Sequence, residues 1–332
     1  IIQMMYLPSF LERTAFDGIC VKPDTLILGD NKPIKNLTKK GYSVSEKGRL
    51  AEILEVMSRP YDGDLMKIKP KYLEPVVTTP EHPMRIVRKE MLRYDSDQLK
   101  PLLDNYSLEW VPAKSVKRGD WVVVPRLKSY LTPKTINLEP FNRLSSSNYR
   151  RGLTSFPLNA ETAWLLGLYV AEGFTGGLQN KRYINFTLHK KEKELAGRID
   201  SVFKKLGYKT NVYFYKDGRN PMEIRAVCTA LARALDEWIG KGALNKQIPD
   251  FIMFTSAEIK TAFLRGLFQG DGYIKGNQVH FHTSSKTLAL QTQLLIASLG
   301  GLLGISYVKP YQREIRGGKV ISGDSWQLRG SS

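Results

Sequence analysis

Two stretches decide the fold: residues 165–173, with the sequence LLGLYVAEG, and residues 264–272, with the sequence LRGLFQGDG. Each is predicted to be a short apolar helix that ends in one carboxylate, Glu172 or Asp271, followed by glycine. A carboxylate at the end of an apolar run is costly to bury unless it meets a cation. Two such helix ends brought together therefore predict a site for a divalent metal ion.

Small residues recur on one face of each predicted helix. With about 3.6 residues per turn, Gly167 and Ala171 share a face of the first helix, and Gly266 and Gly270 share a face of the second. Small residues four apart let two helix backbones approach closely, so we expect the two helices to pair and their terminal carboxylates to lie side by side.

Paired carboxylates repel one another unless a hard cation lies between them. Mg²⁺ (or Mn²⁺) with bridging waters suits Glu172 and Asp271, and it would activate a water and stabilise the leaving oxygen of a phosphodiester. The alternative is two ordinary solvated helix ends. That alternative would be favoured for a single copy, because Asp-Gly is common turn chemistry. Two copies in matched positions favour the metal site.

The C-terminal half, residues 159–332, is an internal repeat of the order α-β-β-α-β-β. The first repeat is predicted over 159–255 and the second over 256–332. We expect strands at 183–187, 211–215, 279–283 and 306–308, and helices at 191–206, 230–239 and 286–299. Pairing of the motif helices would give a pseudo-two-fold α+β domain with the sheets fanned outward. The second repeat is expected to stop about one helix short of a full copy.

The N-terminal half has a different pattern. Residues 20–126 predict an all-β domain of short strands, the clearest at 25–28, 65–68, 76–79 and 121–124, separated by turn signals. Residues 1–19 read as a flanking segment, and residues 127–158, rich in proline and serine, read as a basic linker.

Composition narrows the class of partner. The chain of 332 residues carries a formal net charge of +18, spread along its length, which favours a folded basic surface for a polyanion. Ribosomal and membrane-surface proteins can share this balance. Cys20 and Cys228 are the only cysteines, which argues against a disulfide scaffold and fits a reducing, cytoplasmic compartment. No run of about 18 apolar residues and no secretory signal are seen.

The paired motifs resemble those of LAGLIDADG homing endonucleases, in particular the type carried inside inteins. Residues 245–252 (NKQIPDFI) resemble that family's Lys-x-Ile-Pro block, and residues 286–305 resemble its second helix block. The resemblance implies a monomer that cuts both strands of a long double-stranded DNA site with a divalent metal, without a membrane or a small-molecule cofactor. It also implies that Lys246 lies beside the metal and stabilises the transition state. The alternative is an ordinary surface lysine.

The same resemblance implies that the sheets form a saddle that reads the DNA major groove, as β-ribbons can. Polar residues of the expected strands are candidate DNA contacts: Lys181, Arg182, Tyr183, Asn185, Thr187, Tyr213, Tyr215, Lys275, Asn277, Gln278, His280 and His282. The alternative is a solvated sheet face.

Residues 20–126 resemble a Hint domain, the fold of intein splicing domains. The matching stretches are 20–27, 79–83, 110–113 and 118–122. The resemblance implies that the Cys20 thiol attacks the carbonyl of Ile19, that His82 protonates the departing amide nitrogen, and that Thr79 polarises the peptide. A buried cysteine and a loop histidine are the alternative. Cys228 is expected to be a core residue.

A splicing intein ends in His-Asn, whereas this chain ends QLRGSS, so complete splicing is not expected. Residues 1–19 would be remaining host sequence. The leading interpretation is an intein-type homing endonuclease with a partial N-terminal Hint domain. One alternative is a self-processing protein with a decayed nuclease. Another is a non-cleaving DNA- or RNA-binding protein, such as a maturase or a regulator. The presence of both carboxylates and Lys246 favours the endonuclease over the non-cleaving protein.

Overall fold

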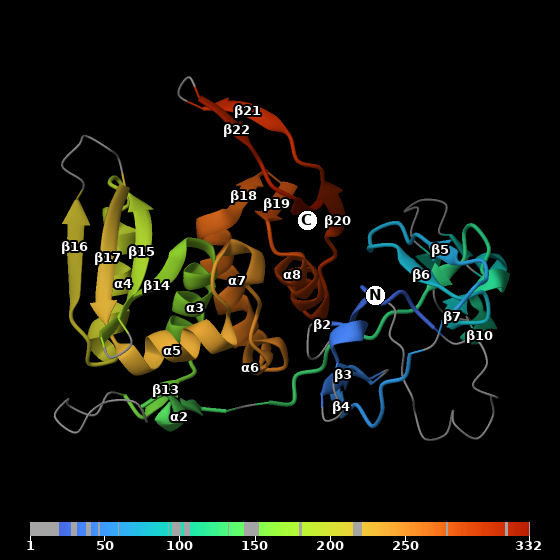
Figure 1. Cartoon of the computed structure of the whole chain (residues 1–332), viewed down its shortest axis with the longest axis horizontal. Helices are drawn as coiled ribbons and strands as arrows, with labels where there is room; N and C mark the ends of the chain where they lie inside the picture. The colour runs from blue at the N-terminus through green and yellow to red at the C-terminus, as the bar shows by residue number, and fades with distance from the viewer. Residues whose placement is uncertain are drawn as a thin grey trace. The chain divides into compact units, whose positions relative to one another are not determined.

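The computed structural model describes residues 20–27, 32–37, 41–45, 47–58, 60–91, 93–94, 101–102, 107–131, 133–142, 153–178, 181–214, 221–276, 278–315 and 318–331. It divides into two compact units, Ile1–Lys128 and Ser129–Ser332. Figure 1 traces the chain through both units, and each is described by itself. Ile19, Tyr215 and Asn277 lie outside the described residues.

The first unit consists of short antiparallel strands. Its two-stranded pairs are β1 (Leu26–Ile27) with β2 (Lys32–Pro33), β3 (Tyr42–Val44) with β4 (Leu50–Glu52), β5 (Met66–Ile68) with β6 (Val76–Thr78), and β8 (Arg93–Tyr94) with β9 (Pro101–Leu102). A three-stranded sheet has the order β10 (Glu109–Pro112), β7 (Pro83–Val87), β11 (Trp121–Val122). Single 3-10 turns lie at Ile34–Asn36, Lys89–Met91 and Ala113–Ser115.

A small core holds the three-stranded sheet together. Met84 and Ile86 of β7 pack with Val111 and Ala113, and β5 covers them. The apolar residues of β7 alternate with Arg85, as expected for a strand with one buried face. The expected strands at 65–68, 76–79 and 121–124 contain β5, β6 and β11, which are shorter than the sequence suggested.

The second unit contains the two repeats. The first comprises α3 (Ala160–Glu172), β14 (Gly173–Leu178), β15 (Lys181–His189), α4 (Lys193–Lys205), β16 (Thr210–Phe214), β17 (Pro221–Val227) and α5 (Thr229–Trp238). The second comprises α7 (Ala257–Asp271), β18 (Gly272–Lys275), β19 (Gln278–Thr283), α8 (Lys286–Ser298), β20 (Gly304–Val308), β21 (Gln312–Ile315), β22 (Gly318–Ile321) and β23 (Ser325–Ser331). Between the repeats lie the 3-10 turn Ala243–Asn245 and α6 (Asp250–Met253).

The two motif helices end at the predicted carboxylates but begin several residues before the predicted stretches. The Asn159 side chain caps α3 by accepting from the N–H groups of Glu161 and Thr162, and Ser256 caps α7 in the same way through Ile259. Helix α3 ends at Glu172 and α7 ends at Asp271, each followed by glycine. Both carboxylates therefore stand on the last residue of a helix.

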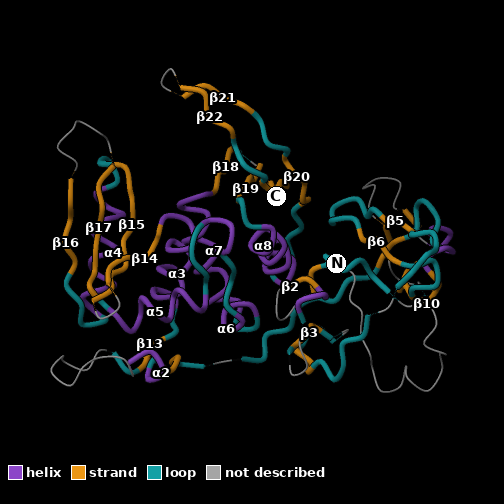
Figure 2. The backbone as a smooth tube through the Cα atoms, viewed as in Figure 1, coloured by secondary structure: helices purple, strands orange, loops and turns teal. Residues whose placement is uncertain are grey.

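Helices α3 and α7 pack backbone against backbone, between the two sheets (Figure 2). A Cβ added at Gly167 would lie 1.9 Å from the Phe263 oxygen, and one added at Gly266 would lie 2.0 Å from the Trp164 oxygen. No side chain fits in either place. The indole of Trp164 also donates to the Gln269 side chain across the pair, at 2.9 Å. The predicted small-residue contact is confirmed.

The two sheets are built in the same register. The first has the order β14-β15-β17-β16 and the second β18-β19-β23-β20. In the first sheet Gly173 pairs with Phe186, and in the second Gly272 pairs with Phe281, so the glycine after each motif faces the matching residue. The sequence interpretation missed β17 and β23, the strand next to β15 or β19 in each sheet, and the hairpin β21–β22 inserted in the second repeat.

The region 127–158 differs from the predicted linker. Strand β12 (Thr135–Asn137) pairs with β13 (Ser155–Pro157), and the short helix α2 (Glu139–Asn142) lies between them. Leu138 and Phe156 are fully buried, and Phe156 packs its ring against Trp238 of α5. The apolar residues between the prolines therefore attach this region to the second unit, and the division between the units falls after Lys128.

None of the described helices has the length and apolar character needed to cross a lipid bilayer.

The glycine contact gives a stability prediction. Gly167→Ala places a methyl group against the α7 backbone. We therefore expect the free energy of unfolding, measured by chemical denaturation, to fall by about 1–3 kcal/mol. The matched control is Gly197→Ala in α4, where a Cβ meets nothing within 4 Å. That variant should be stabilised by up to about 1 kcal/mol, because alanine is the better helix former. Equal effects of the two substitutions would contradict the close packing.

Candidate active site at the paired helix ends

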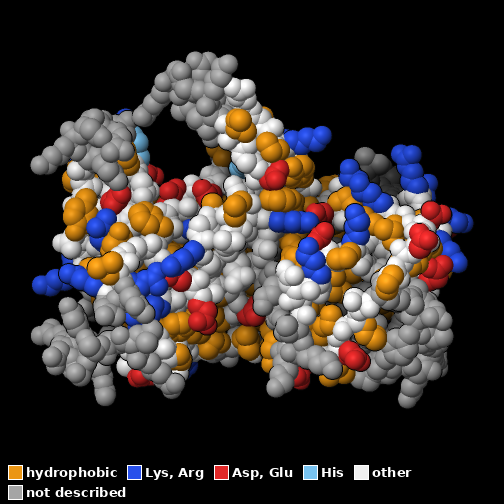
Figure 3. All heavy atoms as spheres, in the orientation of Figure 1, with side chains coloured by type: hydrophobic (Ala, Val, Ile, Leu, Met, Phe, Trp, Pro, Cys, Tyr) orange, Lys and Arg blue, Asp and Glu red, His pale blue; other side chains and the backbone are white. Residues whose placement is uncertain are grey.

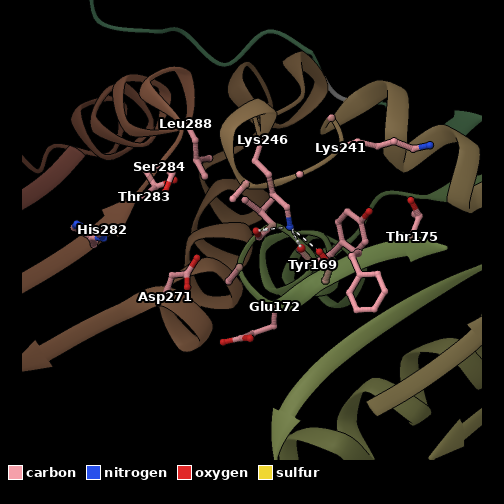
Figure 4. A pocket seen from close by; sticks show the side chains of 17 residues that line it. Tyr169, Glu172, Thr175, Lys241, Lys246, Asp271, His282, Thr283, Ser284 and Leu288 are labelled. Carbon is pink, nitrogen blue, oxygen red and sulfur yellow. Dashed lines mark hydrogen bonds between the residues drawn. The ribbon is translucent and has the colours of Figure 1, made fainter. Parts of the chain in front are cut away.

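A cavity of about 630 Å³ lies at the C-terminal ends of α3 and α7 (Figure 4). Glu172 and Asp271 line it from the two helix ends. Lys241 and Lys246 line it from the connection between α5 and α6, and His282 lines it from β19. The cavity thus brings together the two predicted metal ligands, the predicted catalytic lysine and one predicted DNA contact.

The two helix ends are in direct contact. A Cβ added at Gly270 would lie 2.4 Å from the Ala171 Cβ and 3.0 Å from the Glu172 Cγ, so the Glu172 side chain lies against the last turn of α7. Glu172 is half-buried, and Asp271 is more exposed toward the cavity. The small residues of the motif therefore place the carboxylates as neighbours.

Burial raises the pKa of both carboxyl groups. The pKa of Asp271 rises to about 6 because surrounding protein penalises its charged form, while the Lys246 charge acts in the opposite direction. The pKa of Glu172 rises for the same reason, with a further contribution from the negative charge of Asp271. A cation between the two carboxyl groups would lower both pKa values, because it favours their charged forms.

The donor set fits a hard divalent ion. Carboxylate oxygens are the ligands that Mg²⁺ and Mn²⁺ accept. Among the described residues no group of three or more His, Cys, Asp or Glu side chains is arranged to hold a metal. Glu172 and Asp271 would therefore share an ion with water, backbone oxygen or phosphate oxygen, a shell that suits Mg²⁺, which usually keeps several waters.

Lys246 occupies a buried position at the end of α3. Its ammonium donates to three backbone carbonyls, those of Tyr169 at 2.8 Å, Val170 at 2.7 Å and Gly173 at 2.7 Å. The residue is 8% exposed, and burial lowers its pKa to about 8. The ordinary surface lysine that the sequence left open is therefore wrong. The ammonium caps the helix that carries Glu172.

The Lys246 segment also connects the two repeats. The Lys246 carbonyl accepts from the hydroxyl of Ser285, the N-cap of α8, at 2.6 Å. Two residues after Lys246, the Ile248 N–H donates to the Gln291 side chain at 2.7 Å, and the Ile248 carbonyl accepts from that side chain at 3.0 Å. Residues of the second repeat therefore fix the position of the block that caps α3.

The first sheet presents a polar face built around a residue that the sequence interpretation missed. Arg225 of β17 lies over the rings of Tyr183 at 4.1 Å and Tyr213 at 4.8 Å, and its side chain donates to Asn185 and Glu223. Tyr183, Asn185 and Thr187 alternate with buried Ile184, Phe186 and Leu188 along β15. Asn185 itself is fully buried beneath this cluster. The alternation in 221–227 (PMEIRAV) was the available signal for Arg225.

Arg182 does not share that face. Successive strand residues point to opposite sides, and Arg182 makes an ion pair with Asp236 of α5. Arg182 therefore does not belong to the polar face that carries Tyr183 and Arg225. Lys181 is exposed at the start of β15. Tyr215 and Asn277 are not described, and Lys275 is described only through its backbone.

The second sheet has a corresponding polar face. His280 lies beside the ring of Tyr273, with centroids 6.0 Å apart, and Gln278 and His282 fall on the same side of β19. Register places Arg329 of β23 opposite His280, as Arg225 lies opposite Asn185 in the first sheet. Gln327 and Arg329 were missed because 327–332 was interpreted only as a chain end. On the face drawn in Figure 3, Lys and Arg side chains are distributed over both units.

In the first unit, Cys20 and Thr79 are in contact. The Cys20 N–H donates to the Thr79 hydroxyl at 3.2 Å, and the Cys20 carbonyl accepts from the Thr78 hydroxyl at 2.6 Å and from the Thr79 N–H at 3.0 Å. His82 is 1% exposed, and neither ring nitrogen has a hydrogen-bond partner among the described residues. Burial lowers the His82 pKa to about 4, so the ring is neutral near pH 7. Cys228 is buried in the second unit, as expected.

Comparison with known proteins finds similar sequences inside longer chains. A Hel308 DNA helicase of Thermococcus kodakarensis is 28% identical over 91% of this chain and 29% of its own length. A SufBD-family iron–sulfur cluster assembly protein of Mycobacterium tuberculosis is 24% identical over 91% of this chain and 35% of its own. A replication factor C small subunit of Methanocaldococcus jannaschii is 28% identical over 60% of this chain and 11% of its own. This chain spans about a third of the length of the helicase and of the iron–sulfur cluster assembly protein.

Among solved structures, the homing endonuclease I-DmoI in complex with DNA and calcium has a TM-score of 0.37 and 16% identity, covering 51% of this chain and 82% of its own. The N-terminal LAGLIDADG domain of DUF199/WhiA has a TM-score of 0.34 and 18% identity, covering 53% and 79%. Residues 258–321, which run from α7 into β22, match the family of LAGLIDADG-like domains. The chain therefore carries a LAGLIDADG-like domain of α+β fold.

Proposed function

We propose that the second unit is a Mg²⁺-dependent endonuclease that cuts both strands of a long DNA site, of the homing type carried by inteins. The observation that carries the proposal is the contact between the ends of α3 and α7, which places Glu172 and Asp271 at one cavity with raised pKa values. The match of residues 258–321 to LAGLIDADG-like domains supports the same reaction class.

In this proposal Glu172 and Asp271 hold the divalent ion. When bound, the ion supplies charge neutralisation at the leaving oxygen and a more acidic water. Lys246 contributes by holding the end of α3, and with it Glu172, in position. The two carboxylates come from different repeats, so each repeat would serve one strand of the duplex.

DNA would lie across the polar faces of the two sheets. Tyr183, Tyr213 and Arg225 on one sheet, and His280, His282 and Arg329 on the other, offer hydrogen bonds to base edges and phosphates. The net charge of +18 would supply the salt-dependent part of the affinity.

The carboxylates give the first test of this function. Glu172→Gln and Asp271→Asn should each lower Mg²⁺-dependent cleavage of a plasmid-library target by at least about a hundredfold, because each removes a charge that holds the ion. Glu258→Gln is the control, since Glu258 is exposed in the first turn of α7, at the opposite end from Asp271. Cleavage that is equal in all three variants would refute the metal assignment.

The raised pKa of Asp271 gives a pH prediction. Metal binding requires the deprotonated carboxylate, and a pKa of about 6 leaves roughly a tenth of Asp271 deprotonated at pH 5 and most of it at pH 7. The affinity for Mn²⁺, measured by calorimetry without DNA, should therefore fall about tenfold or more from pH 7 to pH 5. Asp271→Asn should bind weakly at both pH values. A flat profile for the unmodified protein would contradict the prediction.

The related sequences support the intein part of the proposal. Sequences similar to this chain lie within a helicase, an iron–sulfur cluster assembly protein and a replication factor subunit, and the similar part is a minor share of each. Proteins with such different names share no single activity that the segment could serve. An inserted element with its own chemistry accounts for this distribution.

Self-processing in the first unit is a second candidate function, favoured by the contacts of Cys20. We propose that the Cys20 thiol attacks the Ile19 carbonyl, which forms a thioester and breaks the Ile19–Cys20 amide bond. The Thr79 hydroxyl accepts from the amide N–H of Cys20, and the neutral His82 ring, which has no hydrogen-bond partner among the described residues, is the candidate base that takes the thiol proton and passes it to the leaving nitrogen.

This chemistry predicts cleavage by added thiol. Incubation with dithiothreitol should release residues 1–19, detected by mass spectrometry, and Cys20→Ala should abolish the release because no thioester can form. His82→Gln and Thr79→Ala should slow it by about tenfold or more. Cys228→Ala is the matched cysteine control, since burial raises the Cys228 pKa to about 12. Release from Cys20→Ala would exclude the thioester route.

A further inference from the structure

We propose that Lys241 binds a DNA phosphate at the rim of the acidic cavity and is, among the described residues that line it, the lysine available to the nucleic acid. The inference rests on the proposed nuclease function and adds a residue to it. The family resemblance implied that Lys246 stabilises the transition state. The hydrogen bonds of Lys246 instead favour Lys241 as the residue that contacts the phosphate.

Lys246 has no donor left for a phosphate. A lysine ammonium has three N–H groups. All three are used by the carbonyls of Tyr169, Val170 and Gly173, at 2.7–2.8 Å. Turning one N–H toward a phosphate would break one of these three hydrogen bonds at the buried end of α3. Lys246 therefore serves as a fixed cap, and the phosphate needs another cation.

Lys241 lines the same cavity with its ammonium accessible. Its side chain is 65% exposed, and its one ion-pair partner among the described residues is Asp236, at 3.3 Å. Glycines at 240 and 242, with φ of 89° and 74°, hold the loop in conformations that other residues rarely adopt. A Cβ at Gly240 would lie 2.2 Å from the Asn245 oxygen, so the loop is closely packed beneath Lys241.

Asp236 can release Lys241 without being left unpaired. Arg182 also makes an ion pair with Asp236, and those two side chains are only 14% and 12% exposed. Thr175 donates a hydrogen bond to the same carboxylate. The Arg182–Asp236 pair keeps its charge balance when the ammonium moves, and the Lys241 side of its own pair with Asp236 is 65% exposed, so water competes for the ammonium. Asp236 therefore keeps Lys241 beside the cavity in the absence of DNA.

The position of Lys241 selects the phosphate. In Figure 4 its nitrogen points away from the Glu172 and Asp271 carboxylates, toward the side of Thr175. A DNA strand with one phosphate at Glu172 and Asp271 would have its adjacent phosphate within reach of Lys241. The contact also adds positive charge at the rim of a cavity whose two carboxylates would repel DNA.

The test is DNA binding in EDTA, without metal or cleavage, measured by fluorescence anisotropy on a duplex over a range of salt concentrations. Lys241→Met should lower the slope of log K against log salt by about one, the value for one lost phosphate contact, and weaken binding about fivefold at low salt. Lys241→Arg should keep the slope. The melting temperature of Lys241→Met should equal that of the unmodified protein.

Lys204→Met is the matched control. Lys204 is 67% exposed and pairs with a single carboxylate, Asp200, on the surface of α4, away from the cavity. Its variant should bind like the unmodified protein. If Lys241→Met keeps the slope of the control while the unmodified protein binds DNA, the inference is overturned and the nuclease proposal stands. If the unmodified protein shows no salt-dependent DNA binding, both are overturned.

Discussion

Direct backbone contact between α3 and α7 is the constraint on which the second unit depends. At Gly167 and Gly266 there is no room for a side chain, because the backbones of the two helices are in direct contact there. That contact determines how near Glu172 and Asp271 come to one another, and each sheet follows directly from the glycine after its motif. The position of the candidate metal site is therefore a consequence of helix packing.

Burial and charge act against each other at this site. The same packing that brings the carboxylates together surrounds them with protein, which penalises their charged forms and raises the pKa of both. Lys246 offsets part of this effect, but its ammonium is committed to the end of α3. Two uncompensated carboxyl groups are an unfavourable arrangement for folding alone. Their presence at a cavity is better explained by a function that brings a cation.

Sequence reasoning located the features that depend on local residues. The C-terminal ends of both motif helices follow from the carboxylates and the glycines after them, and the close packing follows from the four-residue spacing of small side chains. It failed where long-range pairing decides. Strand β23 lies in the middle of its sheet although its residues stand at the end of the chain, and no local pattern shows that Arg329 faces His280. Strand alternation alone puts Arg182 on the other face from Tyr183, but its ion pair with Asp236, far away in sequence, has no local signal.

The capping role of Lys246 could not be predicted from the sequence for the same reason, because a lysine in a motif does not reveal which carbonyls surround it. Its segment joins elements of both repeats: the ammonium holds the end of α3, while the adjoining backbone is held by Ser285 and Gln291 of the second repeat. Each half of the domain thus completes the other's scaffold. A substitution in one repeat at these contacts therefore changes the support of the other repeat as well.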